Sequence, residues 1–203
     1  MCIVCSGNYD QNTTMINCNN CKFVKKIPPL KGIKYLYCGY TNITEIPFLP
    51  NLEILHCSNT KIKNIPMLPK LRKLTCIKTQ IKQIFNLPEL FDLTCEYSAV
   101  TNIGELPKLV CLDCRNTPIE YIPELQRLRL LLCDDCNHLY KINVSCLIVS
   151  NRCQWIEKPH KSIALLKKTQ AMSKKYLKRR DFISRILLNR FLYFDIIQII
   201  MAY

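Results

Sequence analysis

Apolar residues recur along most of the chain with a fixed period of 19 residues. In one unit of this pattern, mostly polar residues separate the apolar positions Leu52, Leu55, Cys57, Ile62 and Ile65. The cysteine of the unit returns without a break at Cys38, Cys57, Cys76, Cys95, Cys114 and Cys133. A short, fixed period predicts a solenoid, because one unit is too small to bury its own apolar residues and must stack on its neighbours.

Each unit is expected to contain one short strand followed by an extended return segment. Leu55 and Cys57 are two residues apart and therefore lie on one side of a strand, whereas His56 points to the other side. Pro66 and Pro69 exclude a helix from the return segment. We therefore expect extended, polyproline-like backbone on the side opposite the strands.

The unit resembles the leucine-rich repeat, in which apolar residues occupy unit positions 1, 4, 6, 11 and 14 and Asn or Cys occupies position 9. Leu52 stands at position 1 and Thr60 at position 9, and the ending from Ile65 to Pro69 is similar to a short, proline-containing subclass. The resemblance covers residues 16–156, or about seven units. It implies an α/β leucine-rich-repeat solenoid with a curved parallel sheet on its concave side and an extended, polyproline-like convex side.

Position 9 is expected to carry a buried row of hydrogen-bonding side chains. The hydroxyl-bearing residues at this position are Thr41, Thr60, Thr79, Ser98 and Thr117. The resemblance implies that these hydroxyls bond the backbone of adjacent turns. We assign them a structural role, and we expect the position 6 cysteines to be small, buried apolar side chains.

Two further parts are expected outside the repeats. Residues 1–15 form an N-terminal cap or arm, and residues 157–203 are a basic segment followed by an amphipathic one. The second segment holds 11 Lys and Arg against 3 acidic residues. It lacks Pro and Gly after Pro159, and its apolar residues follow helical spacing from Phe182, which predicts C-terminal α-helices. These helices either cap the last repeat or bind a partner.

The residues that we expect to contact a ligand lie at unit positions 3, 5, 7 and 8, which the resemblance places on the concave face. They are Tyr35, Tyr37, Tyr40, His56, Lys73, Thr75, Asp92, Thr94, Tyr97, Asp113 and Arg115. Tyrosine is favoured at recognition surfaces because it brings a large contact area with little loss of conformational entropy. We therefore expect a non-enzymatic protein–protein interaction module that binds a protein or peptide. The alternative is a merely solvated face.

Two other functions depend on the C-terminal segment. Its cations could bind nucleic acid or an anionic surface through Lys167, Lys168, Lys174, Lys175, Lys178, Arg179 and Arg180. No RNA-binding aromatic pattern or DNA-reading motif accompanies them. The segment from Tyr193 to Tyr203 resembles the start of an F-box, which implies a substrate-recognition adaptor of a ubiquitin ligase.

Four cysteines near the N-terminus have spacing typical of a zinc site, since the pair Cys2 and Cys5 is followed by the pair Cys18 and Cys21. However, Cys18 and Cys21 occupy positions 6 and 9 of the first repeat, so packing accounts for them without a metal. We therefore assign no cofactor and keep these residues as a zinc alternative. The repeat pattern does not explain Cys2 and Cys5.

Catalysis has no support in the sequence, which lacks a nucleophile elbow, a phosphate-binding loop and a paired-carboxylate pattern. We expect no enzymatic activity.

A reducing compartment is expected, because a repeat position explains most of the 14 cysteines. Residues 1–7 lack the features of a secretory signal, and the apolar stretch of residues 191–203 is too short to span a membrane. We expect a cytoplasmic or nucleocytoplasmic monomer. Enrichment in Ile, Asn and Lys, with Cys at position 6, is also similar to leucine-rich-repeat proteins of large DNA viruses, which would place the protein in a host cell.

Overall fold

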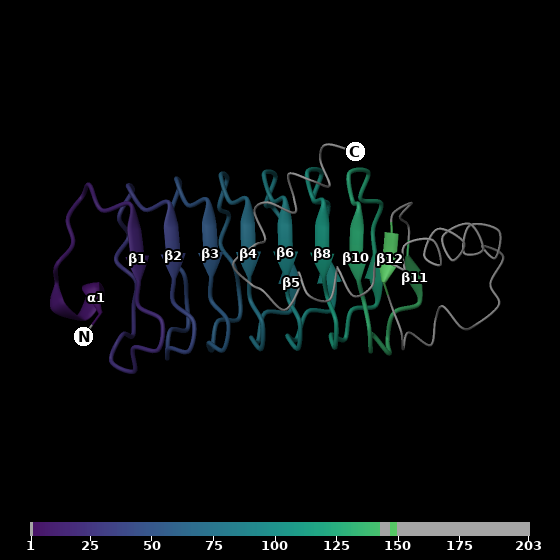
Figure 1. Ribbon diagram of the computed structural model, residues 1–203, viewed down its shortest axis with the longest axis horizontal. Coiled ribbons are helices and arrows are strands. Elements are labelled where there is room, and N and C mark those ends of the chain that lie inside the picture. The colour runs from purple at the N-terminus through teal and green to yellow at the C-terminus, as the bar shows by residue number, and fades with distance from the viewer. Residues whose placement is uncertain (1, 143–146, 150–203) are drawn as a thin grey trace, which may run out of the picture. The chain divides into compact units, whose positions relative to one another are not determined.

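The computed structural model describes residues 2–142 and 147–149, with side chains described up to residue 142 (Figure 1). A single turn of helix, α1 (Ile3–Ser6), precedes the repeats and ends at Gly7, whose φ is 72°. Eight short strands then form one parallel sheet. They are β1 (Met15–Asn17), β2 (Tyr35–Tyr37), β3 (Ile54–His56), β4 (Lys73–Thr75), β6 (Asp92–Thr94), β8 (Cys111–Asp113), β10 (Leu130–Leu132) and β12 (Leu147–Val149).

The strand register shows that 19 residues make one turn of the solenoid. Leu36 pairs with Leu55, Leu55 with Leu74, and Leu74 with Leu93. The middle residue of each strand therefore lies beside its equivalent one unit later. The predicted repeat solenoid with a parallel sheet is confirmed.

The opposite side of the solenoid differs partly from the prediction. In the later turns it forms a second parallel sheet of β5 (Gln83–Ile84), β7 (Asn102–Ile103), β9 (Tyr121–Ile122) and β11 (Lys141–Ile142). Gly104 stands where Pro66 stands two units earlier, and its N–H donates to the Ile84 carbonyl at 2.8 Å. Proline has no N–H to donate, so the turns that end in Ile-Pro lack this bond between return segments.

The core lies between the two sides and consists of stacked rows of equivalent residues. The row Leu52, Leu71, Leu90 and Leu109 has no exposed surface. The position 6 cysteines are also fully buried, as predicted. Each buried leucine contributes about 1.5–3 kcal/mol relative to an exposed one, so the repeated rows supply the main driving force for folding.

The position 9 hydroxyls are buried as predicted, but our expectation that they bond adjacent turns was wrong. Thr60 Oγ1 donates to the Cys57 carbonyl of its own turn at 2.7 Å. The equivalent bonds of Thr41, Thr79, Ser98 and Thr117 are 2.6–2.8 Å long. Backbone groups already make the bonds between turns, since Cys57 N–H donates to the Thr75 carbonyl at 2.9 Å. A short hydroxyl side chain therefore bonds a carbonyl three residues back in the chain.

Several predictions made from the sequence concern residues outside the part of the chain that the structure describes. They concern the C-terminal α-helices of residues 157–203, the basic cluster within them and the F-box-like segment. Within residues 2–142 and 147–149, the α component of the predicted α/β class is the four-residue α1. No helix in this part of the chain is long and apolar enough to cross a membrane.

Candidate protein-interaction face

The predicted ligand residues follow the outer side of the eight-stranded sheet, which we call the strand face. In β2, β3 and β4 the middle residue is buried and its two neighbours are half-buried. Parallel register arranges the outward residues in two rows. One row joins Tyr35, Ile54, Lys73 and Asp92, and the other joins Tyr37, His56, Thr75, Thr94 and Asp113. The structure thus brings the predicted position 3 and 5 residues to one face.

Aromatic side chains gather at the β2–β3 end of the strand face. The ring centroids of Tyr37 and His56 are 6.4 Å apart, with the rings tilted by 46°. Tyr35 is half-buried one row away. Tilted ring pairs at this separation are favourable, so these side chains form an aromatic surface with polar edges.

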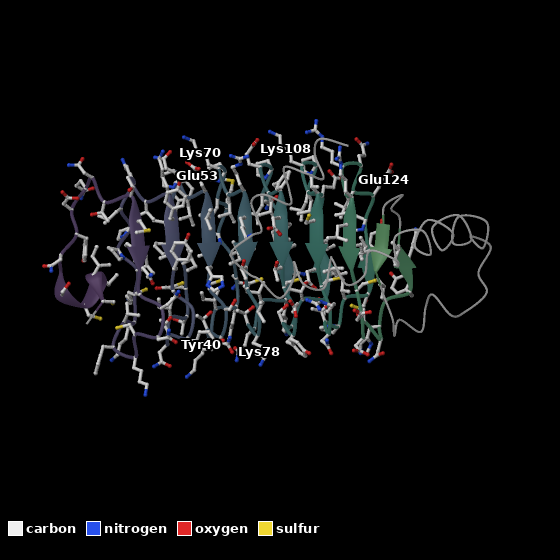
Figure 2. All side chains as sticks on the ribbon, in the orientation of Figure 1. Tyr40, Glu53, Lys70, Lys78, Lys108 and Glu124 are labelled. Carbon is white, nitrogen blue, oxygen red and sulfur yellow. The ribbon has the colours of Figure 1, made fainter. Side chains whose placement is uncertain are left out.

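Position 8 forms a third row, which we call the turn row, at the end of the strands. Its residues all have a left-handed backbone, with φ between 54° and 61°. They are Asn20, Tyr40, Asn59, Lys78, Tyr97, Asn116 and Asp135. The row lies along one edge of the strands, where Figure 2 labels Tyr40 and Lys78, on the opposite side from Lys70 and Lys108.

Tyr40, Lys78 and Tyr97 are unusual members of the turn row. Asn and Asp tolerate a left-handed backbone, whereas other side chains with a Cβ pay about 1–2 kcal/mol for it. The repeat imposes the conformation, because the N–H of Tyr40 donates to the Ser58 carbonyl at 2.8 Å and that of Tyr97 donates to the Arg115 carbonyl at 3.0 Å. Tyr40 and Tyr97 are 59% and 54% exposed, and Lys78 Nζ lies 5.7 Å from the Tyr97 ring centroid.

The middle of the strand face carries ion pairs that the sequence did not reveal. Lys73 Nζ lies 2.8 Å from Asp92 Oδ2, and the Asp92 side chain is only 4% exposed. Burial raises the pKa of Asp92, and the neighbouring Lys73 partly opposes this shift. Asp92 was predicted to contact a ligand, but its carboxylate is buried and paired with a cation one turn away.

Arg115 organises a second group of charges on the late turns. Its Nε and Nη2 donate to the two carboxylate oxygens of Asp113 at 2.9 and 2.7 Å. Its Nη2 also lies 2.7 Å from Glu96 Oε1. These bonds raise the pKa of Arg115, and burial raises the pKa of Glu96. Asp113 is 6% exposed, so its carboxylate is engaged with Arg115 rather than open to a ligand, whereas the Arg115 side chain stays partly exposed.

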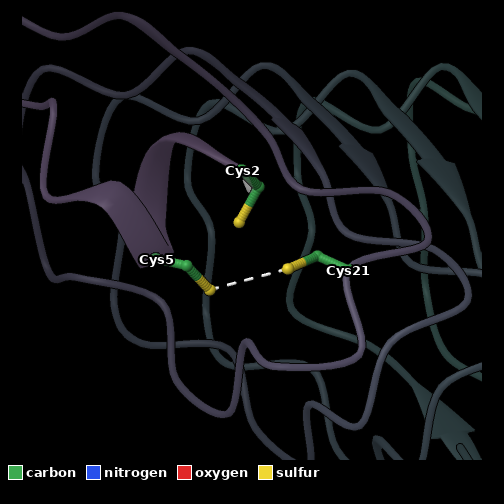
Figure 3. Close-up of side chains that lie close together, drawn as sticks. All are labelled: Cys2, Cys5 and Cys21. Atoms are coloured by element: carbon green, nitrogen blue, oxygen red, sulfur yellow. Dashed lines mark hydrogen bonds between the residues drawn. The ribbon is translucent and has the colours of Figure 1, made fainter.

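The cysteine candidates separate into two groups in the structure. Cys2 and Cys5, from the start of α1 and within it, lie beside Cys21 of the first repeat (Figure 3). Their three Sγ atoms lie within 4.8 Å of one another, and the Cys5 and Cys21 sulfurs are 3.5 Å apart. Cys18 is fully buried in the core, as its repeat position predicts.

The surroundings of Cys5 and Cys21 act on their pKa values in opposite directions. Hydrogen bonding from the Phe23 backbone, and then from the Cys2 thiol, lowers the pKa of Cys21 to about 6. Desolvation, followed by the bond to Cys21, raises the pKa of Cys5 to about 12. Cys21 is therefore a stronger acid than Cys5, and a thiolate is the form that binds metal ions.

Sequence reasoning missed the left-handed backbone of the turn row, and for the N-terminal cysteines it did not separate Cys18 from the other three. The sequence did contain a signal for the left-handed backbone of the turn row. Asn20, Asn59 and Asn116 share unit position 8, and Asn is among the non-glycine residues most enriched at positive φ. The cysteine spacing offered a cysteine cluster as an alternative, but only tertiary packing decides that Cys2 and Cys5 lie beside Cys21 while Cys18 is buried in the core.

Comparison with known families agrees with this architecture. The family whose model matches the chain is described as leucine-rich repeats in two copies, and the match covers residues 32–70. Those residues include β2 and β3. The match shows leucine-rich repeats within residues 32–70, and the parallel strands with the same 19-residue register continue this architecture through the later described turns. No curated protein matches this chain. Leucine-rich repeats commonly serve as protein-binding modules.

Proposed function

We propose that this protein is a non-enzymatic interaction module that binds a protein or peptide along the strand face and the turn row. The observation that carries the proposal is the exposure of Tyr40 and Tyr97 on strained backbone. Asparagine occupies the same position in three other turns and fits the conformation better. Large exposed side chains held at a local cost are typical of functional positions.

The dimensions of the turn row suit an extended peptide. Tyr40 and Tyr97 belong to the turns of β2 and β6, which are three strand spacings apart. With about 4.8 Å between neighbouring strands, this separation is about 14 Å. An extended segment of about four residues spans that distance, since a strand rises about 3.3 Å per residue. Lys78 lies between the two tyrosines along the row, beside the Tyr97 ring.

The charge of the early turns favours an acidic partner. Residues 1–82 contain 12 Lys and Arg against 3 acidic residues, whereas residues 83–142 contain 5 against 9. The aromatic end of the strand face therefore lies in the basic half of the repeats. Complementary charge raises the association rate and suppresses wrong partners, so an acidic segment with an aromatic or aliphatic anchor fits this half.

The experiment is a pull-down from a reducing cytosolic extract with the full chain and with a Tyr40→Asn/Tyr97→Asn variant. Asparagine keeps the backbone of the turn row and removes only the two rings, so the fold is preserved. Tyr140→Ala is the matched control, because Tyr140 is 61% exposed but lies in a return segment. We expect a protein partner that the control retains and the double variant loses.

The same experiment separates the other functions predicted for the C-terminal segment. With a further variant that ends at Trp155, binding that is lost with residues 157–203, collapses with salt and brings nucleic acid would contradict the proposal. Recovery of ubiquitin-ligase subunits by that segment would instead assign the repeats to substrate recognition. If the Tyr40→Asn/Tyr97→Asn variant still gave either of these results, the turn row would not be the binding site.

A further inference from the structure

Three cysteines from separate parts of the chain meet at the N-terminal end of the solenoid. Cys2 is the N-cap residue of α1, Cys5 lies within this helix, and Cys21 lies at position 9 of the first repeat. Figure 3 shows their sulfur atoms directed toward one shared space. All three side chains are half-buried, so the space between the sulfurs borders solvent. The repeat pattern accounts for a cysteine at position 9, but it requires none in α1.

The spacing of the sulfurs suits a metal ion. Zinc binds thiolates at about 2.3 Å in tetrahedral geometry, which places two sulfur ligands about 3.8 Å apart. The Cys5 and Cys21 sulfurs are 3.5 Å apart, and all three lie within 4.8 Å of one another. Small side-chain rotations therefore bring them to ligand distance. A disulfide has an S–S length of about 2.05 Å and could use only two of the three sulfurs.

The later repeat supplies an internal comparison. Cys133 and Cys136 have the same spacing and unit positions as Cys18 and Cys21. There the Cys136 thiol lies within the core and donates to the Cys114 carbonyl at 3.0 Å. Position 9 cysteine can thus serve packing alone. Cys21 differs because a segment with two more cysteines covers it.

We propose that Cys2, Cys5 and Cys21 bind one Zn²⁺ ion through three thiolates, with a water molecule as the fourth ligand. On binding, each cysteine that is still protonated releases its proton to solvent, and all three sulfurs form bonds to zinc. Cys18 takes no part, because it is fully buried in the core of the first turn. The soft, three-sulfur donor set selects Zn²⁺ over Mg²⁺ or Ca²⁺, which prefer oxygen ligands.

The ion would fasten the N-terminal segment to the first repeat. α1 has only four residues, no side-chain cap and no fully buried residue. Such a helix is not stable by itself, because one turn does not offset the cost of helix nucleation. Ile3 and Val4 are partly buried against the core, so α1 covers the open end of the solenoid. A metal that links α1 to Cys21 holds this cover in place.

Cobalt titration of the full, reduced and metal-free chain tests the proposal. Co²⁺ bound by three thiolates in tetrahedral geometry gives intense visible bands and a sulfur-to-metal charge-transfer band, and Zn²⁺ displaces it. We expect one equivalent to bind, with at least tenfold weaker binding in each of Cys2→Ser, Cys5→Ser and Cys21→Ser. Cys111→Ser is the control, since this buried cysteine lies in β8, far along the sheet.

Two further measurements keep the test decisive if a variant fails to fold. X-ray absorption of the zinc-loaded wild-type chain is expected to show three sulfur ligands at about 2.3 Å and one lighter ligand. Thermal unfolding of the wild type is expected to shift upward with Zn²⁺. Absence of Co²⁺ binding by the reduced wild type would overturn the proposal. Four sulfur ligands, or unchanged binding after Cys2→Ser and Cys5→Ser, would also overturn it. Neither result bears on the tyrosines of the turn row.

Discussion

Replacement of Thr79 isolates the contribution of the position 9 hydroxyls. Thr79 is 5% exposed, and its Oγ1 donates to the Cys76 carbonyl at 2.8 Å. Valine has nearly the same shape but no hydroxyl, so Thr79→Val leaves this buried carbonyl without the bond. An unpaired buried polar group costs about 1–3 kcal/mol.

Thr79→Ser is the matched variant, because it keeps the hydroxyl and removes one methyl group. Serine already occupies this position at Ser98, where its Oγ donates to the Cys95 carbonyl at 2.6 Å. Loss of one buried methyl group costs about 0.5–1.5 kcal/mol. Stability should therefore fall in the order wild type, Thr79→Ser, Thr79→Val, although valine preserves more volume.

The assay is urea unfolding followed by circular dichroism, with thermal melting as a second measure. For a chain of this size, about 2 kcal/mol corresponds to a melting temperature about 4–8 °C lower. If volume alone decided stability, the order of the two variants would reverse. A Thr79→Val protein at least as stable as Thr79→Ser would refute the assignment of the hydroxyl bond as a major structural element.

Three other outcomes are expected. Gly104→Ala should lower stability by about 1–3 kcal/mol in urea unfolding, because the new Cβ would lie 2.8 Å from Phe85 Cβ; Gly7→Ala, where nothing lies within 4 Å, tests instead the effect of its positive φ. Tyr40→Asn should raise stability by about 0.5–1 kcal/mol through relief of its left-handed backbone, with Tyr140→Asn as a neutral control. Burial raises the pKa of Asp92, so the folded state binds its proton more tightly than the unfolded state does. The stability gained by protonation is complete below the unfolded pKa and is lost as pH rises through the raised value. Asp92→Asn should therefore stabilise the protein at pH 7 relative to wild type and change little at pH 3; equal differences at both pH values would contradict this.

The sequence predicted which residues lie on the candidate face, but it did not predict which of them are buried. Tyr37 and His56 were placed correctly on the outer side of the sheet, because alternation along a strand is a local property. Asp92 and Asp113 were placed on the same face, but their burial was not foreseen. Their partners are Lys73, one turn away, and Arg115, two residues on. Which cation reaches a carboxylate depends on side-chain geometry that unit positions do not specify.

The sequence by itself determined the solenoid, its period and its inward rows, because every turn repeats the same apolar spacing and neighbouring turns supply the same contacts. Tertiary structure decided the backbone conformation of the turn row, the partner of each position 9 hydroxyl and which of the four N-terminal cysteines meet. These features arise where a turn meets something other than a copy of itself or where a backbone conformation is imposed by inter-turn bonds. Periodicity shows which positions successive units share, but it does not specify the backbone conformation, the hydrogen-bond partner or the contacts with a segment outside the repeats.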